Sequence, residues 1–228
     1  MQIAFTIYGI FAYSIIAALY FFIEKNLLGN KIIKGIKYGI TCAVIWIVYL
    51  LEPLPHVNSI DRITYPMADS AALIVMGLLL GLFCSMDNPK MEHDKNRNIL
   101  NDIFSVCCIT ICFAVGRVIQ YVLIDIYSSF ENEKLYTFLW VALTGFVIGA
   151  TMLYLKEYLV KRSRIKTSLI LGCMLFGIDL LLFNFFMPLV FSTDIPDLII
   201  RTLIDIIAIT IGIYLILSKD KRILYTHY

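Results

Sequence analysis

Long apolar runs alternate with short polar connections along the chain. Seven of these runs approach or exceed the length of about 20 residues that an α-helix needs to cross a bilayer. They predict transmembrane helices over residues 3–23, 35–52, 61–85, 99–127, 135–156, 166–191 and 197–217. Because the connections are short, the sequence predicts an all-α fold, a seven-helix bundle in a single domain over residues 1–228. Such short loops are also typical of a prokaryotic protein.

The composition indicates a membrane protein and excludes a soluble domain. Apolar residues make up 60% of the chain and charged residues 16%, with a mean hydropathy of +0.84. Soluble domains are about half apolar and about a quarter charged. The helices use nearly all of the residues, so any site must be built from them and from their connections. A net charge of +2, evenly spread, indicates no nucleic-acid partner.

The basic residues predict how the bundle is oriented. Lys and Arg in short loops stay on the cytoplasmic side of a membrane. The connections after the first, third and fifth helices, together with the tail, carry fifteen of them, whereas the alternate connections carry two, Arg62 and Lys134. The sequence therefore predicts a multi-pass protein of the cell membrane, with the amino terminus outside and the carboxyl terminus in the cytoplasm.

Ionisable residues inside the helices form the candidate site. An isolated charge near the middle of a bilayer costs several kcal/mol or more, so such a residue is paired or faces a cavity. Five of them are predicted at overlapping depths in the outer half of the bundle: Asp69, Arg117, Asp179, Arg201 and Asp205. With Arg62 nearer the surface, their charges sum to about zero, which predicts a mutually compensated network.

Helical spacing directs these residues inward. Arg201 and Asp205 are four residues apart and share a face. Arg62, Tyr65 and Asp69 follow steps of three and four and share another. The network is either an ion-pair lock, since lipid gives helices no hydrophobic drive to associate, or a polar pocket where a ligand or proton exchanges.

The connection between the second and third helices adds polar residues at the same side. They could cap a pocket: Glu52, Pro53, Pro55, His56 and Asp61.

Metal and hydrolase chemistry find no support in the sequence. A metal needs ligands that converge on one face, and adjacent residues such as Cys107 and Cys108 diverge by about 100° around a helix. Cys107, Cys108 and Cys112 are therefore interpreted as small packing residues. The three histidines are predicted on different sides of the membrane, which excludes a histidine-based zinc site. We find no glycine-rich phosphate loop and no serine elbow. The sequence predicts neither a metal site nor a catalytic residue.

Three segments have a pattern that points to a family. Ala18–Phe22 closes the first helix with aliphatic and aromatic residues, Lys34–Leu50 carries the pattern of the second helix, and Leu203–Ser218 carries that of the seventh. They resemble the corresponding helices of the microbial (type I) rhodopsins, seven-helix retinal proteins with the same predicted orientation. The resemblance covers the whole chain in architecture and part of it in residue pattern.

The resemblance implies roles for particular residues. Arg62 resembles the arginine that gates the outer half-channel, and Asp205 resembles the helix-7 aspartate beside the chromophore. Trp140 resembles a ring that lines the retinal pocket. The family holds retinal through a lysine four residues after that aspartate, and here the position is Ile209. Because a Schiff base needs an amine, covalent retinal is excluded, and no other cofactor is predicted.

The predicted third helix also lacks residues that the family uses. The carboxylate expected three residues after the arginine is Tyr65, and Pro66 follows it. The proton-donor position is Met76. Asp69, one turn below Tyr65, could replace the missing carboxylate.

Three classes of function remain open. The leading hypothesis is a sensor or a bundle that binds a small apolar or amphipathic ligand noncovalently and signals to a cytoplasmic protein or to a second copy of itself. The alternative is a gradient-driven ion or proton transporter, because membrane carboxylates can change protonation as access alternates. An intramembrane enzyme is less favoured, since no nucleophile accompanies the carboxylates.

Overall fold

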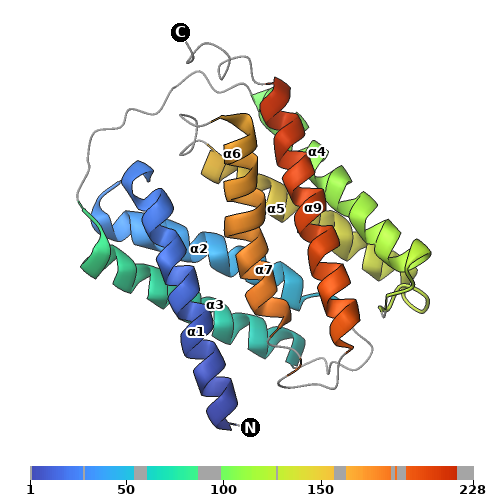
Figure 1. Ribbon diagram of the computed structural model, residues 1–228, viewed down its shortest axis with the longest axis horizontal. Coiled ribbons are helices and arrows are strands. Elements are labelled where there is room, and N and C mark those ends of the chain that lie inside the picture. Colours follow the sequence, from blue (N-terminus) through green and yellow to red (C-terminus); the bar gives the residue numbers. More distant parts are fainter. Residues whose placement is uncertain are drawn as a thin grey trace.

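The computed structural model describes residues 2–27, 29–53, 61–86, 99–126, 128–156, 163–185, 188 and 194–219. Within these ranges the chain is helical, and seven helical spans are long and apolar enough to cross a membrane (Figure 1). The predicted all-helical, multi-pass architecture is thereby confirmed.

The helices have the following bounds: α1 (Gln2–Ile23), the 3-10 turn η1 (Glu24–Asn26), α2 (Lys31–Leu50), α3 (Asp61–Cys84), α4 (Ile99–Val118) with its π-helical end η2 (Ile119–Leu123), α5 (Lys134–Lys156), α6 (Arg164–Leu169), the π-helix η3 (Ile170–Phe176), α7 (Gly177–Asn184) and α9 (Ile195–Lys219). The segments α6, η3 and α7 together form the sixth span.

Two boundaries differ from the predicted ones by four residues. The second helix begins at Lys31 because the Asn30 side chain caps it, accepting a hydrogen bond from the Ile33 amide at 2.9 Å. The fourth span ends at Leu123 rather than at 127, and Asp125 then adopts a φ of 59°, which a continuing helix cannot contain. The described part of the sixth span ends at Asn184. The predicted stretch beyond it lies largely outside the described residues.

Glycine brings α2 and α3 into backbone contact. A Cβ atom placed on Gly35 would lie 2.1 Å from the Gly77 carbonyl oxygen, and one on Gly39 would lie 2.8 Å from the Leu73 carbonyl oxygen. Gly77 and Gly81 face them from α3. Small residues four apart allow this close approach, which replaces the hydrophobic drive that helices lack in lipid.

The other half of the bundle is built around α4. It packs against α5 on one side and α9 on the other, and α9 also packs against the sixth span. Small residues again form the contacts, with Gly145 of α5 against Thr110 and Gly212 of α9 against Ile109. The helix α2 contacts α5 and so connects the two halves, while α1 lies against α3 and α7 (Figure 1).

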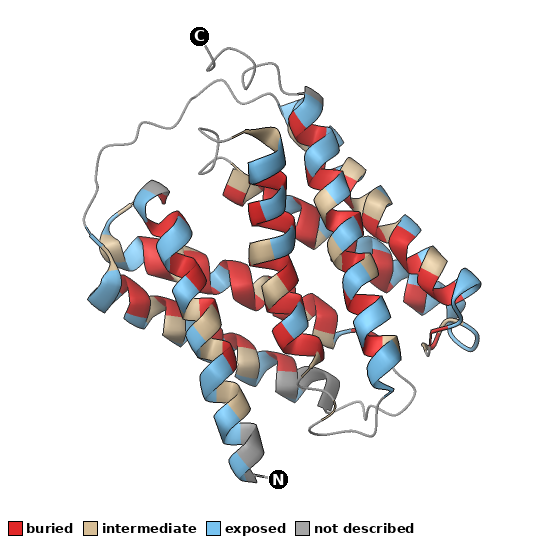
Figure 2. Cartoon of the chain, in the orientation of Figure 1, coloured by how far each residue is buried: buried red, intermediate tan, exposed pale blue. Residues whose placement is uncertain are grey.

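Apolar side chains face both inward and outward. The core holds large buried aromatics such as Tyr20, Tyr38 and Phe113, whereas Ile7, Phe83 and other large apolar residues are exposed on the outside of the helices. Exposed and buried positions alternate along every span (Figure 2). An outer surface this apolar fits acyl chains rather than water.

Candidate functional site: a polar clasp and a buried carboxyl

Arg117 of α4 is the centre of a buried ion-pair cluster at the end of the bundle where α2 ends and α9 begins. Its side chain is fully buried. Nη2 lies 2.7 Å from Oδ2 of Asp205 on α9, and Nη1 lies 3.2 Å from Oε1 of Glu52, just beyond α2. Nη1 also donates a hydrogen bond to the Tyr121 hydroxyl at 3.3 Å. One guanidinium group thus connects three spans.

Glu52 brings in a second arginine. Its other carboxylate oxygen, Oε2, lies 3.3 Å from Nη1 of Arg201 on α9, so Glu52 bridges both guanidinium groups. Two arginines and two carboxylates balance in charge, which a buried cluster requires because an unpaired ion in this environment is expensive.

Asp205 accepts hydrogen bonds on both of its oxygens. Oδ2 accepts from the Tyr49 hydroxyl at 3.2 Å, in addition to Arg117. Oδ1 accepts from the Gln120 amide at 2.7 Å, and the same amide nitrogen donates to the Arg201 carbonyl oxygen at 3.3 Å. We call this cluster the clasp; its members are Glu52, Arg117, Gln120, Arg201 and Asp205.

Aromatic rings surround the central guanidinium of the clasp. The Cζ atom of Arg117 lies 4.8 Å from the ring centre of Trp140, 5.2 Å from that of Phe113 and 5.7 Å from that of Tyr49. Cation–π attraction is strongest where water is excluded, as it is here. Trp140 is itself fixed by its indole nitrogen, which donates to the Val48 carbonyl oxygen at 2.6 Å.

A second buried ion pair lies at the opposite end of the bundle, where α2 begins. Lys34 Nζ lies 3.1 Å from Oε1 of Glu24 and donates to the Met86 carbonyl oxygen at 3.0 Å. The Met86 amide in turn donates to Glu24 at 3.0 Å. The nearby Tyr20 hydroxyl hydrogen-bonds Ser85. This basic-end pair, Lys34 and Glu24, therefore joins the ends of α1 and α3 to the start of α2.

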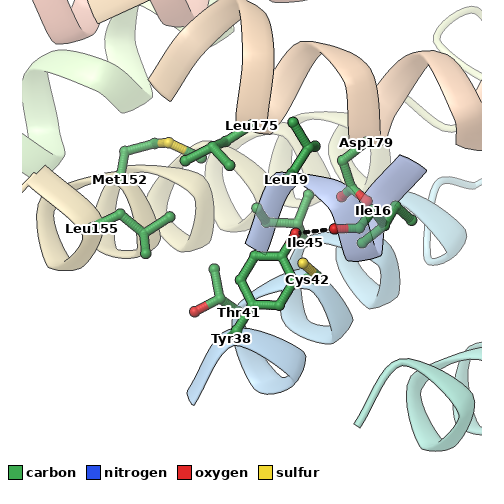
Figure 3. Close-up of a pocket in the computed structure, with 10 residues that line it drawn as sticks. All are labelled: Ile16, Leu19, Tyr38, Thr41, Cys42, Ile45, Met152, Leu155, Leu175 and Asp179. Atoms are coloured by element: carbon green, nitrogen blue, oxygen red, sulfur yellow. Dashed lines mark hydrogen bonds between the residues drawn. The ribbon is translucent and has the colours of Figure 1, made fainter. Parts of the chain in front are cut away.

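Asp179 of α7 lies in neither cluster. Its side chain is 4% exposed, and Oδ1 has no hydrogen-bond partner. It lines a cavity of about 20 Å³ together with Tyr38 and Cys42 of α2 and Ile16 of α1, and all of the lining residues are buried (Figure 3). We call this space, lined by Ile16, Leu19, Tyr38, Thr41, Cys42, Ile45, Met152, Leu155, Leu175 and Asp179, the acid cavity.

Helix α2 connects all three features. Lys34 lies in its first turn, Tyr38 and Cys42 line the acid cavity, and Tyr49 reaches the clasp. At about 1.5 Å per residue, Cys42 lies ~12 Å along the helix from Lys34 and ~10 Å from Tyr49. The cavity is therefore between the two ion-pair clusters.

The structure brings together three of the sequence-predicted site residues, Arg117, Arg201 and Asp205. It does not add Asp179 to them. Asp69 is half-buried and accepts a hydrogen bond from the Trp46 indole at 3.2 Å. The side chains of Arg62 and Tyr65 lie outside the described residues, as do Pro55 and His56 of the predicted capping connection.

Sequence reasoning assigned Glu52 to a cap over the site, whereas it is the bridging carboxylate within it. A signal was available, because Trp46, Tyr49 and Glu52 are three residues apart and share a face of the second helix. Gln120 carried no such signal, since its neutral side chain was not counted among the charges. Lys34 was counted for orientation and as part of the pattern of the second helix, and Glu24 was not singled out.

The remaining expectations concern cofactors and known relatives. Ile209, at the position of the retinal lysine, is fully buried in the apolar core. Among the described residues no three His, Cys, Asp or Glu side chains gather as metal ligands. No protein-family model, curated protein or solved structure matches this chain. The function must therefore be argued from the geometry.

Proposed function

We propose that the chain is a gradient-driven ion transporter whose two ends open in turn. The observation that supports this function is the presence of buried ion-pair clusters at both ends of the bundle, with a cavity that contains one buried carboxyl group between them. Alternating access requires a binding position in the middle of the membrane and a separable closure on each side of it. The clasp and the basic-end pair are candidates for these closures.

Buried ion pairs are suited to such closures. Removing two charges from water costs free energy that nearly offsets their mutual attraction. The net stability of a buried ion pair is therefore small, and hydration of the two charges can exceed it when water enters. The close backbone packing of α2 and α3 at their glycines, in contrast, has no comparable replacement when the two helices separate. The motion of lowest cost therefore keeps the glycine-packed pair α2 and α3 together. The clasp opens when this pair moves away from α4 and α9, and the basic-end pair opens when the end of α1 moves away from α2.

The sixth span contains a place where it can bend. Seven residues, Ile170–Phe176, form the π-helix η3, and Gly177 follows directly. Wide turns of this kind have weaker intrahelical hydrogen bonding and often occur at functional positions. Bending here would move α7, which carries Asp179, relative to α6.

The sensing hypothesis stays a prediction, as does the resemblance to the microbial rhodopsins. A noncovalent ligand of drug size needs a pocket of roughly 300–1,000 Å³. The acid cavity has about 20 Å³, which suits a single water molecule. A space of about 550 Å³ lies in the open groove between Tyr13 of α1 and the apolar face of α3, away from the clasp and the acid cavity. A thermal-shift screen with apolar and amphipathic compounds tests this alternative, and a stabilising compound whose effect depends on Asp205 would favour it.

Flux across a liposome membrane tests the transport proposal directly. The purified chain is reconstituted with a pH-sensitive dye inside, and a potassium diffusion potential is imposed with valinomycin. We expect ion uptake that exceeds the uptake of protein-free liposomes and depends on the size of the potential. Absence of both proton and sodium flux, under potentials and gradients of either sign, would overturn the proposed function.

Labelling of Cys42 tests the two closures. Cys42 lines the acid cavity, and the other five cysteines can be replaced by alanine. We expect little reaction of Cys42 with a small thiol reagent in the otherwise unchanged chain. Glu24→Gln should raise the rate of reaction with reagent that enters from the end of the bundle where α2 begins. Glu52→Gln should raise the rate with reagent that enters from the end where α2 ends. Equal rates in all three proteins would contradict the assignment of these pairs as closures.

A further inference from the structure

We infer that Asp179 is the proton-binding site of this protein and that the transported ion is a proton, an inference that rests on the proposed transport function. The carboxyl group is buried in the acid cavity, and its Oδ1 atom has no partner. No described basic side chain balances it, and both arginines of the clasp are already bound to Glu52 and Asp205.

The surroundings of Asp179 differ from those of a structural carboxyl. The titratable groups that face it are Tyr38 and Cys42 of α2, with Tyr13 of α1 farther away. From α5 and η3 the cavity receives only Met152, Leu155 and Leu175. Toward α9, the Asn184 amide of the same helix donates to the Thr202 hydroxyl at 2.8 Å and does not donate to Oδ1 of Asp179.

The hydroxyl groups nearest to the cavity have their protons engaged elsewhere. The Tyr38 hydroxyl donates to the Ile16 carbonyl oxygen at 2.6 Å, and Thr41 donates to the Lys37 carbonyl oxygen at 2.9 Å (Figure 3). Neither hydroxyl forms a hydrogen bond with Oδ1, but their oxygen lone pairs remain able to accept from a water molecule in the cavity. The cavity can therefore stabilise a proton on Asp179 through such a water molecule.

A metal cation does not fit the same space. Calcium and magnesium take about six or more oxygen ligands, and potassium in channels is held by rings of carbonyl oxygens. Six of the ten cavity-lining residues are aliphatic or methionine, and the volume of about 20 Å³ leaves no room for a hydration shell. A proton needs only one oxygen atom and one water molecule.

The exchange step is a simple proton transfer. With one closure open, a hydronium ion gives its proton to Oδ1 of Asp179, forming the neutral carboxylic acid and releasing water. With the other closure open, the acid O–H bond breaks toward a water molecule on that side, which restores the carboxylate and forms hydronium. No other reactant is required, and the net result is one proton moved across the membrane.

The experiment combines flux with a spectroscopic readout that does not need transport. Asp179→Asn is compared with Asp197→Asn, the same change in the first turn of α9, and with Asp179→Glu. We expect Asp179→Asn to abolish proton flux, Asp197→Asn to retain it, and Asp179→Glu to retain part of it. The infrared measurement compares difference spectra recorded at two pH values. We expect a carboxylic C=O band in the unaltered protein and expect it to be missing in Asp179→Asn alone.

The outcomes separate this inference from the proposed function. Flux that persists in Asp179→Asn, or flux carried by sodium without a pH change, overturns the proton site while transport stands. If the unaltered protein carries no ion, the proposed function fails. A C=O band that titrates and vanishes in Asp179→Asn would still identify the proton site, and its absence would refute it.

Discussion

Asp205 and Asp179 are buried carboxyl groups on spans that pack against each other, yet their surroundings are opposite. Asp205 is fully buried and has an arginine, a tyrosine and a glutamine as hydrogen-bond donors. Asp179 is almost as deeply buried, and its Oδ1 atom has no donor. In the clasp, only Arg117 Nε and Gln120 Oε1 lack a partner among the buried polar side-chain atoms.

This difference distinguishes buried charges that stabilise the fold from a buried carboxyl that can exchange a proton. A carboxylate with a complete set of donors loses much free energy when a partner is removed, because the remaining charge has no water to solvate it. A carboxyl group without such donors loses no hydrogen bond or ion pair when it is protonated or replaced by a neutral group. The clasp and the acid cavity should therefore respond to substitution with different signs.

Arg117→Met should have the largest effect on stability. It leaves Glu52 and Asp205 facing each other without their shared guanidinium group and removes the cation–π contacts. Breaking a buried pair typically costs about 3–5 kcal/mol, so we expect the protein to unfold at markedly lower temperature or denaturant concentration in detergent micelles. Lys166→Met, at an exposed position, is the control and should change little. A loss no larger than that of the control would contradict the role of the clasp.

Glu52→Gln should cost less, about 2–3 kcal/mol, because the amide oxygen still accepts a hydrogen bond while the charge balance is lost. A double-mutant cycle with Arg201→Met measures the coupling of the two residues, whose atoms lie 3.3 Å apart. We expect a coupling of about 1 kcal/mol or more. Additive effects would show that the bridge to Arg201 contributes nothing to stability.

Lys34→Met should have an intermediate effect, about 2 kcal/mol, since it leaves Glu24 buried with only the Met86 amide as donor. Adding Glu24→Gln should recover part of the loss, because the unpaired charge is then removed. Unfolding curves of the two variants side by side provide the measurement. If the second change lowers stability further, the pair does not behave as a buried ion pair.

Asp179→Asn should have the smallest effect on stability and the opposite sign. Removing an ionisable group that has no ionic partner should leave the unfolding free energy unchanged or raise it by up to about 1 kcal/mol. A loss of several kcal/mol would show that Asp179 has a structural role like that of Asp205. The comparison of the two carboxyls would then have to be abandoned.

Much of the architecture could be predicted from the sequence alone. A bilayer sets the length of a spanning helix, so apolar runs in the sequence translate directly into spans, and the polar caps adjust their ends by a few residues. The Arg201 and Asp205 pair was recognisable because helical spacing is regular. Asp179 was predicted at the depth of Arg117 and Asp205, whereas its cavity lies between the two ion-pair clusters, because the place of a side chain depends on how its helix packs against its neighbours.

The sequence by itself determined that the chain has seven segments long and apolar enough to cross a membrane and that these segments contain charged residues, because transfer of residues from water to lipid is a property of each segment. Only the tertiary structure decided that Glu52 bridges two arginines and that Oδ1 of Asp179 has no hydrogen-bond partner among the described residues. Ion pairing depends on which helices touch, and that follows from how small residues such as Gly35 and Gly77 let backbones approach, which is a property of two surfaces together.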